Sequence, residues 1–264
     1  MGETGRPVLT AEHLTRRFGG VIALSDYRLN LEEGELLGLI GPNGAGKTTA
    51  FNLLTGVLPP SRGRILLDGT DLTGHRPERF AAVGIARTFQ NIRLFKELTA
   101  WENVAVGYHM RHGPGWFATM LGLPSVRRRE RAMRDWAAEL LAAVGLGEAV
   151  DRRAGDLAYG DQRKLEIARA LATEPRVLLL DEPAAGMNRT ETGRLMETIA
   201  ALHGSRDLTI VVVEHDMRLV MNLCRRIQVL NRGELLAEGT PAEIQANPAV
   251  IEAYLGSGRR RGDA

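Results

Sequence analysis

The sequence predicts an α/β fold with three parts: a parallel-sheet core, an N-terminal antiparallel β subdomain and an inserted α-helical subdomain. Apolar and polar residues alternate in short pieces over residues 1–35, which is typical of antiparallel strands. Strand signals then disappear from 91 to 156, where helical periodicity replaces them. Beyond this stretch, apolar runs alternate with helical segments, as in a doubly wound parallel sheet. We therefore expect a single domain over 1–264, with a helical subdomain at 91–165 and C-terminal helices and a basic tail at 240–264.

The first 90 residues predict the antiparallel layer and the start of the core. Gly19-Gly20 separates two alternating pieces, VLTAEHL at 8–14 and IALSDYRLNL at 22–31, as the turn of a β-hairpin would. The further elements expected here are a strand at 36–40, a helix beginning near Lys47, a strand at 64–67 with a turn at Asp68-Gly69, and a strand at 84–88 that leads to Phe89-Gln90.

The insertion predicts two main helices, at 101–110 and 126–144. In the second helix the apolar residues recur every three or four positions and form one stripe: Met133, Trp136, Ala137, Leu140, Leu141 and Val144. The turn residues GPGWF at 113–117 and Leu123-Pro124 divide the helices.

The last 100 residues predict the rest of the parallel sheet. The continuous apolar runs VLLL at 177–180 and TIVVV at 209–213 suit strands that are covered on both faces. The other elements expected here are helices at 161–173, 189–203 and 216–223, a strand at 227–230, and terminal helices at 241–246 and 248–255.

The composition excludes several classes of protein. A formal net charge of +2 gives no reason to expect a nucleic-acid partner, and the arginine groups at 127–131 and 259–261 are interpreted as a solvated helix face and a tail. The single cysteine, Cys224, excludes a disulfide within the chain and suits a reducing compartment. No apolar run approaches the ~18 residues that span a bilayer, WFATMLGL at 116–123 being too short, and the N-terminus lacks the apolar centre of a secretion signal. We expect a cytoplasmic protein that can dock to a membrane partner.

Residues 41–49 read GPNGAGKTT directly behind a predicted strand, which makes a complete phosphate-binding loop. Its glycines let backbone amides approach an anion closely, and the helix that follows directs the positive end of its dipole at the same point. Lys47 can reach the β- and γ-phosphates, and the Thr48 hydroxyl can ligate Mg²⁺. The sequence therefore predicts a P-loop (RecA-like) core that binds a nucleoside triphosphate through Gly41, Pro42, Asn43, Gly44, Ala45, Gly46, Lys47, Thr48 and Thr49. A dinucleotide-binding oxidoreductase is excluded because Thr49 stands where the third glycine of its motif should fall.

The segment VLLLDE at 177–182 ends a predicted buried strand with two carboxylates. In a parallel sheet that end faces the ligand crevice, beside the phosphate loop. Asp181 is then placed to hold Mg²⁺ through water, and Glu182 to orient and deprotonate the attacking water. The pair indicates hydrolysis, and a P-loop kinase would not need Glu182 beside Asp181.

The segment LAYGDQRKLEIARAL at 157–171 resembles the LSGGQ signature of ATP-binding cassette (ABC) proteins. The resemblance covers essentially all of the chain, and it assigns roles to further positions. It implies that Phe18 stacks on adenine, that Gln90 touches Mg²⁺ and answers to a transmembrane partner, and that His215 is the switch histidine near the γ-phosphate. It also places residues 185–188 in the D-loop, the segment that follows the two carboxylates.

The signature stands at a predicted helix N-terminus, where exposed amides and the helix dipole form a second anion site. Tyr159 and Gly160 are expected before that terminus, with Asp161 as a cap or a first-turn acid. In cassette ATPases this site faces the γ-phosphate bound to the other subunit, so the resemblance implies a head-to-tail pair of ATPase subunits. Ala158 and Asn188 depart from the usual serine and aspartate, and Asp161 from the usual glutamine.

Within the family, several segments are similar to the G-type ATP-binding subunit of branched-chain amino acid importers: the signature, TFQNIRLFKELTAWENVAVG, DEPAAGMN, EHDM and GTPAEIQANPAVIEAYLG. This resemblance implies a companion F-type ATPase subunit, two transmembrane permease subunits and, indirectly, a solute-binding protein. The expected cofactors are ATP and Mg²⁺, and the expected location is the cytoplasmic face of the inner membrane, as a peripheral subunit.

The sequence leaves three alternatives open: a urea or amide importer, a lipid or lipopolysaccharide exporter of the same fold, and a soluble ATP-driven regulatory switch. It decides neither the transported solute nor whether the pair is a homodimer or a heterodimer. The stretch 90–103, with Phe95, Leu98 and Trp101, is a candidate docking surface for a permease helix, and ordinary packing between lobes is the competing interpretation.

Overall fold

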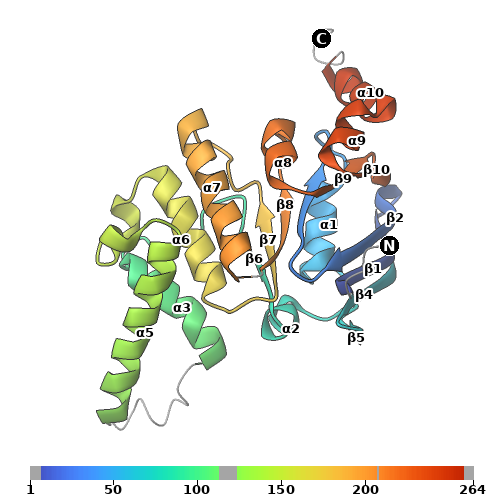
Figure 1. Cartoon of the computed structure of the whole chain (residues 1–264). Coiled ribbons are helices and arrows are strands. Elements are labelled where there is room, and N and C mark those ends of the chain that lie inside the picture. Colours follow the sequence, from blue (N-terminus) through green and yellow to red (C-terminus); the bar gives the residue numbers. More distant parts are fainter. Residues whose placement is uncertain (1–6, 113–123, 207, 259–264) are drawn as a thin grey trace.

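The computed structural model describes residues 7–112, 124–206 and 208–258 (Figure 1). Its N-terminal layer is a four-stranded antiparallel sheet of order β2-β1-β4-β5, formed by β1 (Pro7–Phe18), β2 (Val21–Glu32), β4 (Arg62–Leu67) and β5 (Thr70–Asp71). Phe18 pairs with Val21 across the turn at Gly19-Gly20, so the expected hairpin is confirmed.

The core is a six-stranded sheet of order β10-β9-β3-β8-β7-β6. Five of its strands run parallel, and they are β3 (Leu36–Ile40), β6 (Ile85–Arg87), β7 (Val177–Asp181), β8 (Thr209–Val213) and β9 (Arg226–Asn231). Every residue of β3, β7 and β8 is buried, which is why these strands were readable as continuous apolar runs.

The sixth strand, β10 (Glu234–Gly239), was not expected from the sequence, and neither was the short helix α2 (Pro77–Ala82). Strand β10 pairs antiparallel with β9 at the sheet edge and is only half-buried, so it lacks the apolar run of a central strand. Its turn residues Arg232 and Gly233 both have positive φ, at 50° and 84°, as a two-residue type I′ hairpin requires. The Arg232-Gly233 pair was the feature of the sequence that could have indicated a hairpin and therefore the strand β10.

Helices cover the sheet at positions close to those expected: α1 (Lys47–Leu54), α6 (Tyr159–Leu171), α7 (Arg189–Arg206), α8 (Met217–Leu223), α9 (Pro241–Ala246) and α10 (Pro248–Gly258). Side chains cap the start of four of them: Asn188 caps α7, Asp216 caps α8, and Asn247 caps α10, while Thr240 and Glu243 form a capping box at α9. Helix α6 begins at Tyr159, two residues earlier than expected, so Tyr159 and Gly160 lie inside its first turn.

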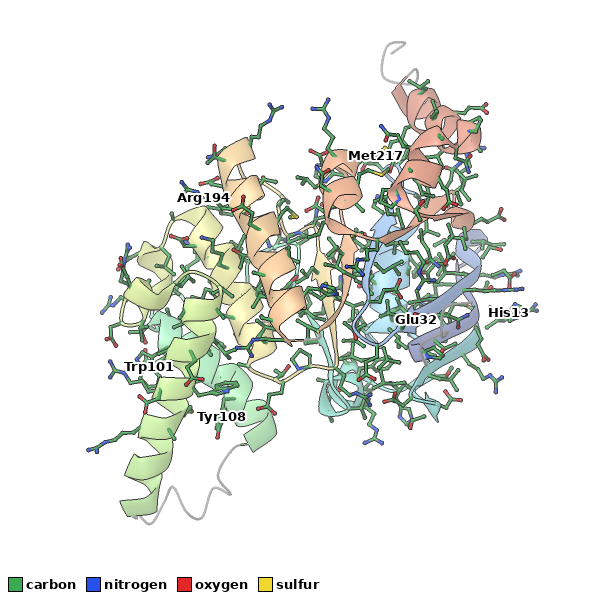
Figure 2. All side chains as sticks on the ribbon, viewed as in Figure 1. His13, Glu32, Trp101, Tyr108, Arg194 and Met217 are labelled. Carbon is green, nitrogen blue, oxygen red and sulfur yellow. The ribbon has the colours of Figure 1, made fainter. Side chains whose placement is uncertain are left out.

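Helices α3 (Ala100–His112) and α5 (Pro124–Ala143) extend from one end of the molecule (Figure 1). The predicted stripe on α5 is confirmed, since five of its members are buried and Trp136 is partly buried. Trp101 and Tyr108 both project from α3 (Figure 2), and the Tyr108 and Trp136 rings meet edge to face at 5.2 Å. The turns at 113–117 and at Leu123, the segment 116–123 and the arginines 259–261 lie outside the described residues.

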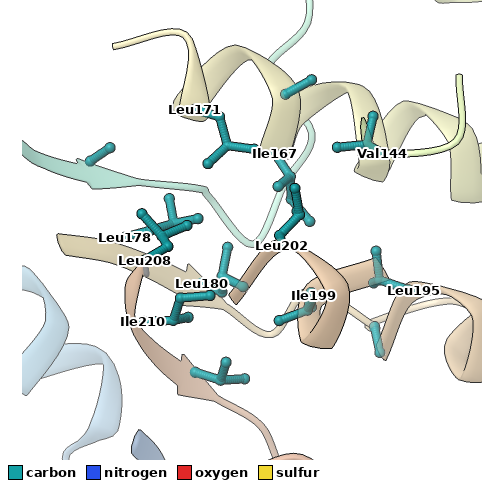
Figure 3. Close-up of a cluster of buried hydrophobic side chains, with 14 of the residues drawn as sticks. Val144, Ile167, Leu171, Leu178, Leu180, Leu195, Ile199, Leu202, Leu208 and Ile210 are labelled. Carbon is teal, nitrogen blue, oxygen red and sulfur yellow. The ribbon is translucent and has the colours of Figure 1, made fainter. Parts of the chain in front are cut away.

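Two hydrophobic clusters fill the two faces of the six-stranded sheet. Leu178, Leu180 and Ile210 point to one face and pack with α6 and α7, as Figure 3 shows. The alternate residues Leu179 and Val211 belong to the second cluster, which the antiparallel sheet and α1 share. Because β3, β7 and β8 run parallel, their carboxyl ends lie together at one end of the sheet.

Among the described residues, no helix combines the length and the apolar character of a membrane span.

Candidate functional site

The phosphate loop is shaped by its backbone. Gly41 and Gly46 have φ values of 153° and 104°, which favour glycine over any residue with a side chain. A Cβ at Gly41 would lie 2.2 Å from the Leu230 carbonyl oxygen, and one at Gly46 would lie 2.8 Å from the Ala23 carbonyl oxygen. The neighbouring strands therefore enclose the loop closely, and both glycines are required for this path.

Helix α1 starts directly behind the loop, with Gly46 as its N-cap and no side chain capping its first amides. Those amides stand at the positive end of the helix dipole and suit a phosphate. Thr48 and Asn43 are exposed there and Thr49 is partly exposed, whereas Ala45 is buried. The predicted loop residues are thus brought together around one anion-binding surface.

Lys47 is folded over the same loop. Its Nζ donates to the carbonyl oxygens of Gly41, at 2.6 Å, and Pro42, at 3.2 Å, and only 7% of the residue is exposed. Burial lowers the pKa of the Lys47 ammonium, and the carboxylates of Glu182 and Asp181 act against this shift. The amine is therefore held at the centre of the loop, within electrostatic reach of the two predicted carboxylates.

Asp181 ends β7 inside the protein, and an arginine that the sequence analysis missed neutralises it. Arg87 Nη2 donates to Asp181 Oδ2 at 2.5 Å, with both side chains at least nine-tenths buried. Arg87 also donates to Asn52 Oδ1 at 2.6 Å and lies over the Phe89 ring. A charged residue at the end of the predicted strand 84–88 was the available signal.

Glu182 adopts a left-handed backbone conformation, with φ of 46°, and its amide donates to the Val213 carbonyl at 2.9 Å. This conformation is costly for a residue with a side chain, and it turns the carboxylate out of the strand. Gln90 Nε2 donates to Glu182 Oε2 at 3.0 Å. Two predicted residues 92 positions apart in the chain are therefore brought into contact.

Strand β8 is followed by Glu214 and His215, at the same end of the sheet as Glu182. His215 was predicted from the sequence, whereas Glu214 was missed. Glu214 is 1% exposed and accepts from the Ala184 amide at 2.9 Å, which ties the residue before the D-loop to the end of β8. Burial raises the pKa of the Glu214 carboxyl, and Glu182 raises it further. His215 Nδ1 lies 3.6 Å from Glu214 Oε2, while its side chain is largely exposed. The run TIVVVEH resembles VLLLDE in ending a buried strand with an acid, and this parallel could have identified Glu214.

The signature residues lie at the start of α6 and contact the D-loop. Ala158 is the N-cap and makes no side-chain cap, so the reading of Asp161 as a cap is wrong; Asp161 lies in the first turn and pairs with Lys164 at 3.2 Å. The Tyr159 hydroxyl donates to the Ala185 carbonyl at 3.0 Å. Asn188 caps the next helix by accepting from the amides of residues 190 and 191, so its departure from the usual aspartate preserves that cap.

Phe18 ends β1 with 45% of its surface exposed. The Arg16 guanidinium lies 4.7 Å from the centre of its ring, and Arg16 is itself held by the Pro59 carbonyl at 2.7 Å. A ring supported on one face by a cation and exposed elsewhere suits stacking on a flat base.

The residues expected to hold Mg²⁺ fit that ion in their chemistry. Thr48, Gln90 and Asp181 all offer oxygen atoms, which are the ligands that Mg²⁺ prefers. The Asp181 carboxylate is buried and paired with Arg87 through Oδ2, and the phosphate loop lies within electrostatic reach of it. The arrangement suits a triphosphate whose negative charge is met by Lys47, loop amides and a metal ion.

Comparisons with known proteins identify the family of the chain. Residues 24–185 match the model of the ABC transporter family, and residues 234–259 match a family described as branched-chain amino acid ATP-binding cassette transporter. The chain is 49% identical over 251 residues to the high-affinity branched-chain amino acid transport ATP-binding protein BraF of Pseudomonas aeruginosa, covering 95% of this chain and 98% of the relative. The LivG protein of Escherichia coli gives the same identity and coverage. The lipopolysaccharide export ATP-binding protein LptB of Haemophilus influenzae is 32% identical over 94% of this chain and 97% of its own length.

Solved structures share the fold. The ADP conformation of MJ1267, an ATP-binding cassette of an ABC transporter, superposes with a TM-score of 0.82 at 30% identity and covers 95% of this chain and 99% of its own. The dimeric cassette MJ0796 gives a TM-score of 0.72 at 26% identity, over 88% of this chain and 98% of its own. The P-loop α/β fold with its antiparallel N-terminal sheet is therefore confirmed. By its sequence, its fold and its phosphate loop, the chain belongs to the ABC transporter family as one of that family's ATP-binding, ATP-hydrolysing subunits.

Proposed function

We propose that this chain hydrolyses ATP to drive an importer of branched-chain amino acids. The observation that carries the proposal is 49% identity over 95% of the chain to two transport ATP-binding proteins named for that substrate class. The match of residues 234–259 to a family described for the same substrate supports it as well. The identity to the lipopolysaccharide-export relative is only 32%, so a lipopolysaccharide exporter is less well supported than a branched-chain amino acid importer.

In this proposal the bound triphosphate lies on the loop amides and Lys47, and adenine stacks on Phe18. Thr48, Asp181 and Gln90 would hold Mg²⁺, which when bound supplies positive charge to the β- and γ-phosphates. Glu182 accepts a proton from the attacking water, which cleaves ATP to ADP and phosphate. Gln90 orients Glu182 through their 3.0 Å hydrogen bond, and His215 is the switch beside the γ-phosphate.

We propose that two such subunits pair head to tail, so that Tyr159, Gly160 and Asp161 of one face the ATP of the other. The solved dimer of the related cassette MJ0796 supports pairing as a property of this fold. The chain would act as a single domain over 1–264, with its helical subdomain at 91–165 and its C-terminal helices at 240–264, bound to permease subunits at the cytoplasmic face of the membrane.

A cavity of about 360 Å³ between the core and the helical subdomain supports a contact with a permease. It is open to solvent, and its lining is mainly apolar but includes charged side chains; among the lining residues are Val57, Phe80, Phe89, Val106, Glu166 and Arg169. This composition suits a short amphipathic helix. Phe95 is 51% exposed and comes shortly after the cavity-lining residue Phe89 in the sequence. Trp101, by contrast, packs against the Arg134 guanidinium. We therefore propose the cavity and Phe95, rather than Trp101, as the permease contact.

The test uses the complex that co-purifies with this chain, reconstituted in vesicles that are loaded with ATP. We expect uptake of labelled leucine, isoleucine or valine, and we expect Glu182→Gln to retain nucleotide binding while turnover falls at least about 100-fold, since general-base catalysis contributes roughly 10²–10⁴ in rate. The control Glu197→Gln alters an exposed glutamate on α7 and should match the unaltered complex. Uptake of urea or an amide without the branched-chain amino acids would contradict the substrate, and full turnover by Glu182→Gln would contradict the catalytic assignment.

A further inference from the structure

Arg163 is a buried charge inside the helical subdomain, on the first turns of α6. Only 3% of the residue is exposed. Its guanidinium donates to the carbonyl oxygens of Phe89, at 2.9 Å, and Gln90, both of which belong to the loop that follows β6. Two adjacent backbone carbonyls are therefore held by two separate nitrogens of one planar guanidinium, Nη1 and Nη2, whose fixed fork a lysine ammonium lacks.

The same guanidinium reaches the signature and, through it, the D-loop. Arg163 Nη2 lies 3.1 Å from the Tyr159 hydroxyl, which in turn donates to the Ala185 carbonyl at 3.0 Å. The Tyr159 ring also closes on Gly186, where a Cβ would lie 3.2 Å from the tyrosine hydroxyl oxygen. One arginine therefore connects the Gln90 loop, the signature and the D-loop within a single chain.

Glu166, one turn further along α6, neutralises this arginine and holds the same loop. Its Oε2 lies 3.3 Å from Arg163 Nη1, and its Oε1 accepts from the Arg93 amide at 3.4 Å. Burial raises the pKa of the Glu166 carboxyl, while Arg163 and Arg169 act to lower it. Arg169 adds a further bond to the Arg93 carbonyl. Residues 89–93 are therefore fastened to α6 at both ends of the segment.

The attachment of residues 89–93 to α6 determines the position of Gln90. The Gln90 carbonyl is bound by Arg163 and its side chain donates to Glu182 at 3.0 Å, so one bond holds the backbone of this residue and the other holds its side chain. Because α6 also lines the cavity described above, a shift of this helix would move Gln90 relative to Glu182.

We propose that Arg163 is a positioning residue for ATP hydrolysis: it holds Gln90 against Glu182 and keeps the signature and the D-loop in register with that contact. The inference rests on the proposed function in taking Glu182 as the base. It goes beyond that function in assigning the connection between the three segments to one side chain, and it predicts an effect on turnover that operates through Gln90.

The test is a double-mutant cycle in the purified transporter complex. Arg163→Met is made alone and together with Glu166→Gln, because the paired change leaves no uncompensated carboxylate in the interior. Both versions are expected to lower the kcat for ATP about 10-fold, less than the roughly 10²-fold that a 1 Å misplacement of reacting groups can cost. The KM for ATP and the affinity for a fluorescent ATP analogue should change less than about twofold. Arg134→Gln, which removes an exposed arginine of the same subdomain from its pair with Asp151, is the control and should leave kcat unchanged.

The cycle with Gln90→Ala decides how Arg163 acts. If it acts through Gln90, adding Arg163→Met to Gln90→Ala costs less than about twofold in kcat, since the two changes remove one coupled contact. Multiplicative losses would overturn the proposal, and so would full activity of Arg163→Lys, which would reduce the role to neutralising Glu166. An active Glu182→Gln complex would instead contradict the proposed function, so the two failures are distinguishable in one preparation.

Discussion

The phosphate loop and the carboxylate cluster behind β7 lie at one edge of the same sheet, yet they are built in different ways. The loop is one continuous segment, residues 41–49, and backbone conformation and helix α1 determine its shape. The cluster is assembled from side chains that come from separate strands and loops: Arg87, Gln90, Asp181, Glu182 and Glu214. The shape of the loop therefore depends on the space around its glycines, whereas the stability of the cluster depends on each buried charge having a partner of opposite charge.

The largest effect is expected where such a partner is removed. Arg87→Gln leaves the Asp181 carboxylate buried without its guanidinium, and breaking a buried pair in this way costs about 3–5 kcal/mol. The exposed pair Arg64–Glu12 provides the matched control, since Arg64→Gln should cost less than about 1 kcal/mol. Urea denaturation of both variants measures the difference. Equal losses would mean that burial of the ion pair does not distinguish the two sites.

The next effect tests the phosphate loop, where a methyl group should matter according to the space available. Gly41→Ala places a Cβ 2.2 Å from the Leu230 carbonyl, and we expect ATP affinity to fall about 10- to 100-fold, equivalent to about 1–3 kcal/mol of strain. Gly44→Ala meets no atom within 4 Å and carries only the cost of its φ of 78°, so its loss should be several-fold smaller. Titration with a fluorescent ATP analogue compares them, and a larger loss for Gly44→Ala would contradict the steric account.

The smallest effect concerns pH, and two glutamates should respond in opposite directions. Burial raises the pKa of Glu214, so its contribution to stability is complete below the ordinary value of 4.5 and is lost as pH rises through the higher folded-state value. Hydrogen bonds from the Thr99 amide and hydroxyl lower the pKa of Glu102, so its contribution is present above 4.5 and is lost as pH falls through the lower folded-state value.

Melting temperatures of the unaltered chain and of the two glutamine variants, measured across this pH range, test the contrast. As pH falls from 7, the unaltered chain should gain stability relative to Glu214→Gln and lose stability relative to Glu102→Gln. If the melting temperatures of the two variants changed with pH in the same way, burial of Glu214 and hydrogen bonding of Glu102 would not shift their pKa values in opposite directions.

The same contrast explains how much the sequence could predict. The buried strands β3, β7 and β8 and the phosphate loop were predicted correctly because each is encoded in consecutive residues, as an apolar run or as a glycine pattern. The edge strand β10 was missed because it is only half-buried and carries no such run.

The side-chain cluster was predicted only in part, because its contacts join distant positions. Arg87 and Asp181 are 94 residues apart, and Arg163 and Phe89 are 74 apart, so no local pattern indicates their pairing. From its residue type, Asp161 could be a cap or a first-turn acid; because Ala158 occupies the N-cap, Asp161 is the third residue of the helix, and only the second alternative is confirmed. The fold, rather than residue type, determines which polar side chains meet.

Glu182 shows what this division means for the evolution of the molecule. Its φ of 46° suits glycine, so a glycine at this position would relieve the backbone and give a sturdier protein that has lost its carboxylate. Selection for robustness alone would therefore move this position away from glutamate. A glutamate kept at this strained position is what the proposed role of Glu182 in hydrolysis would require.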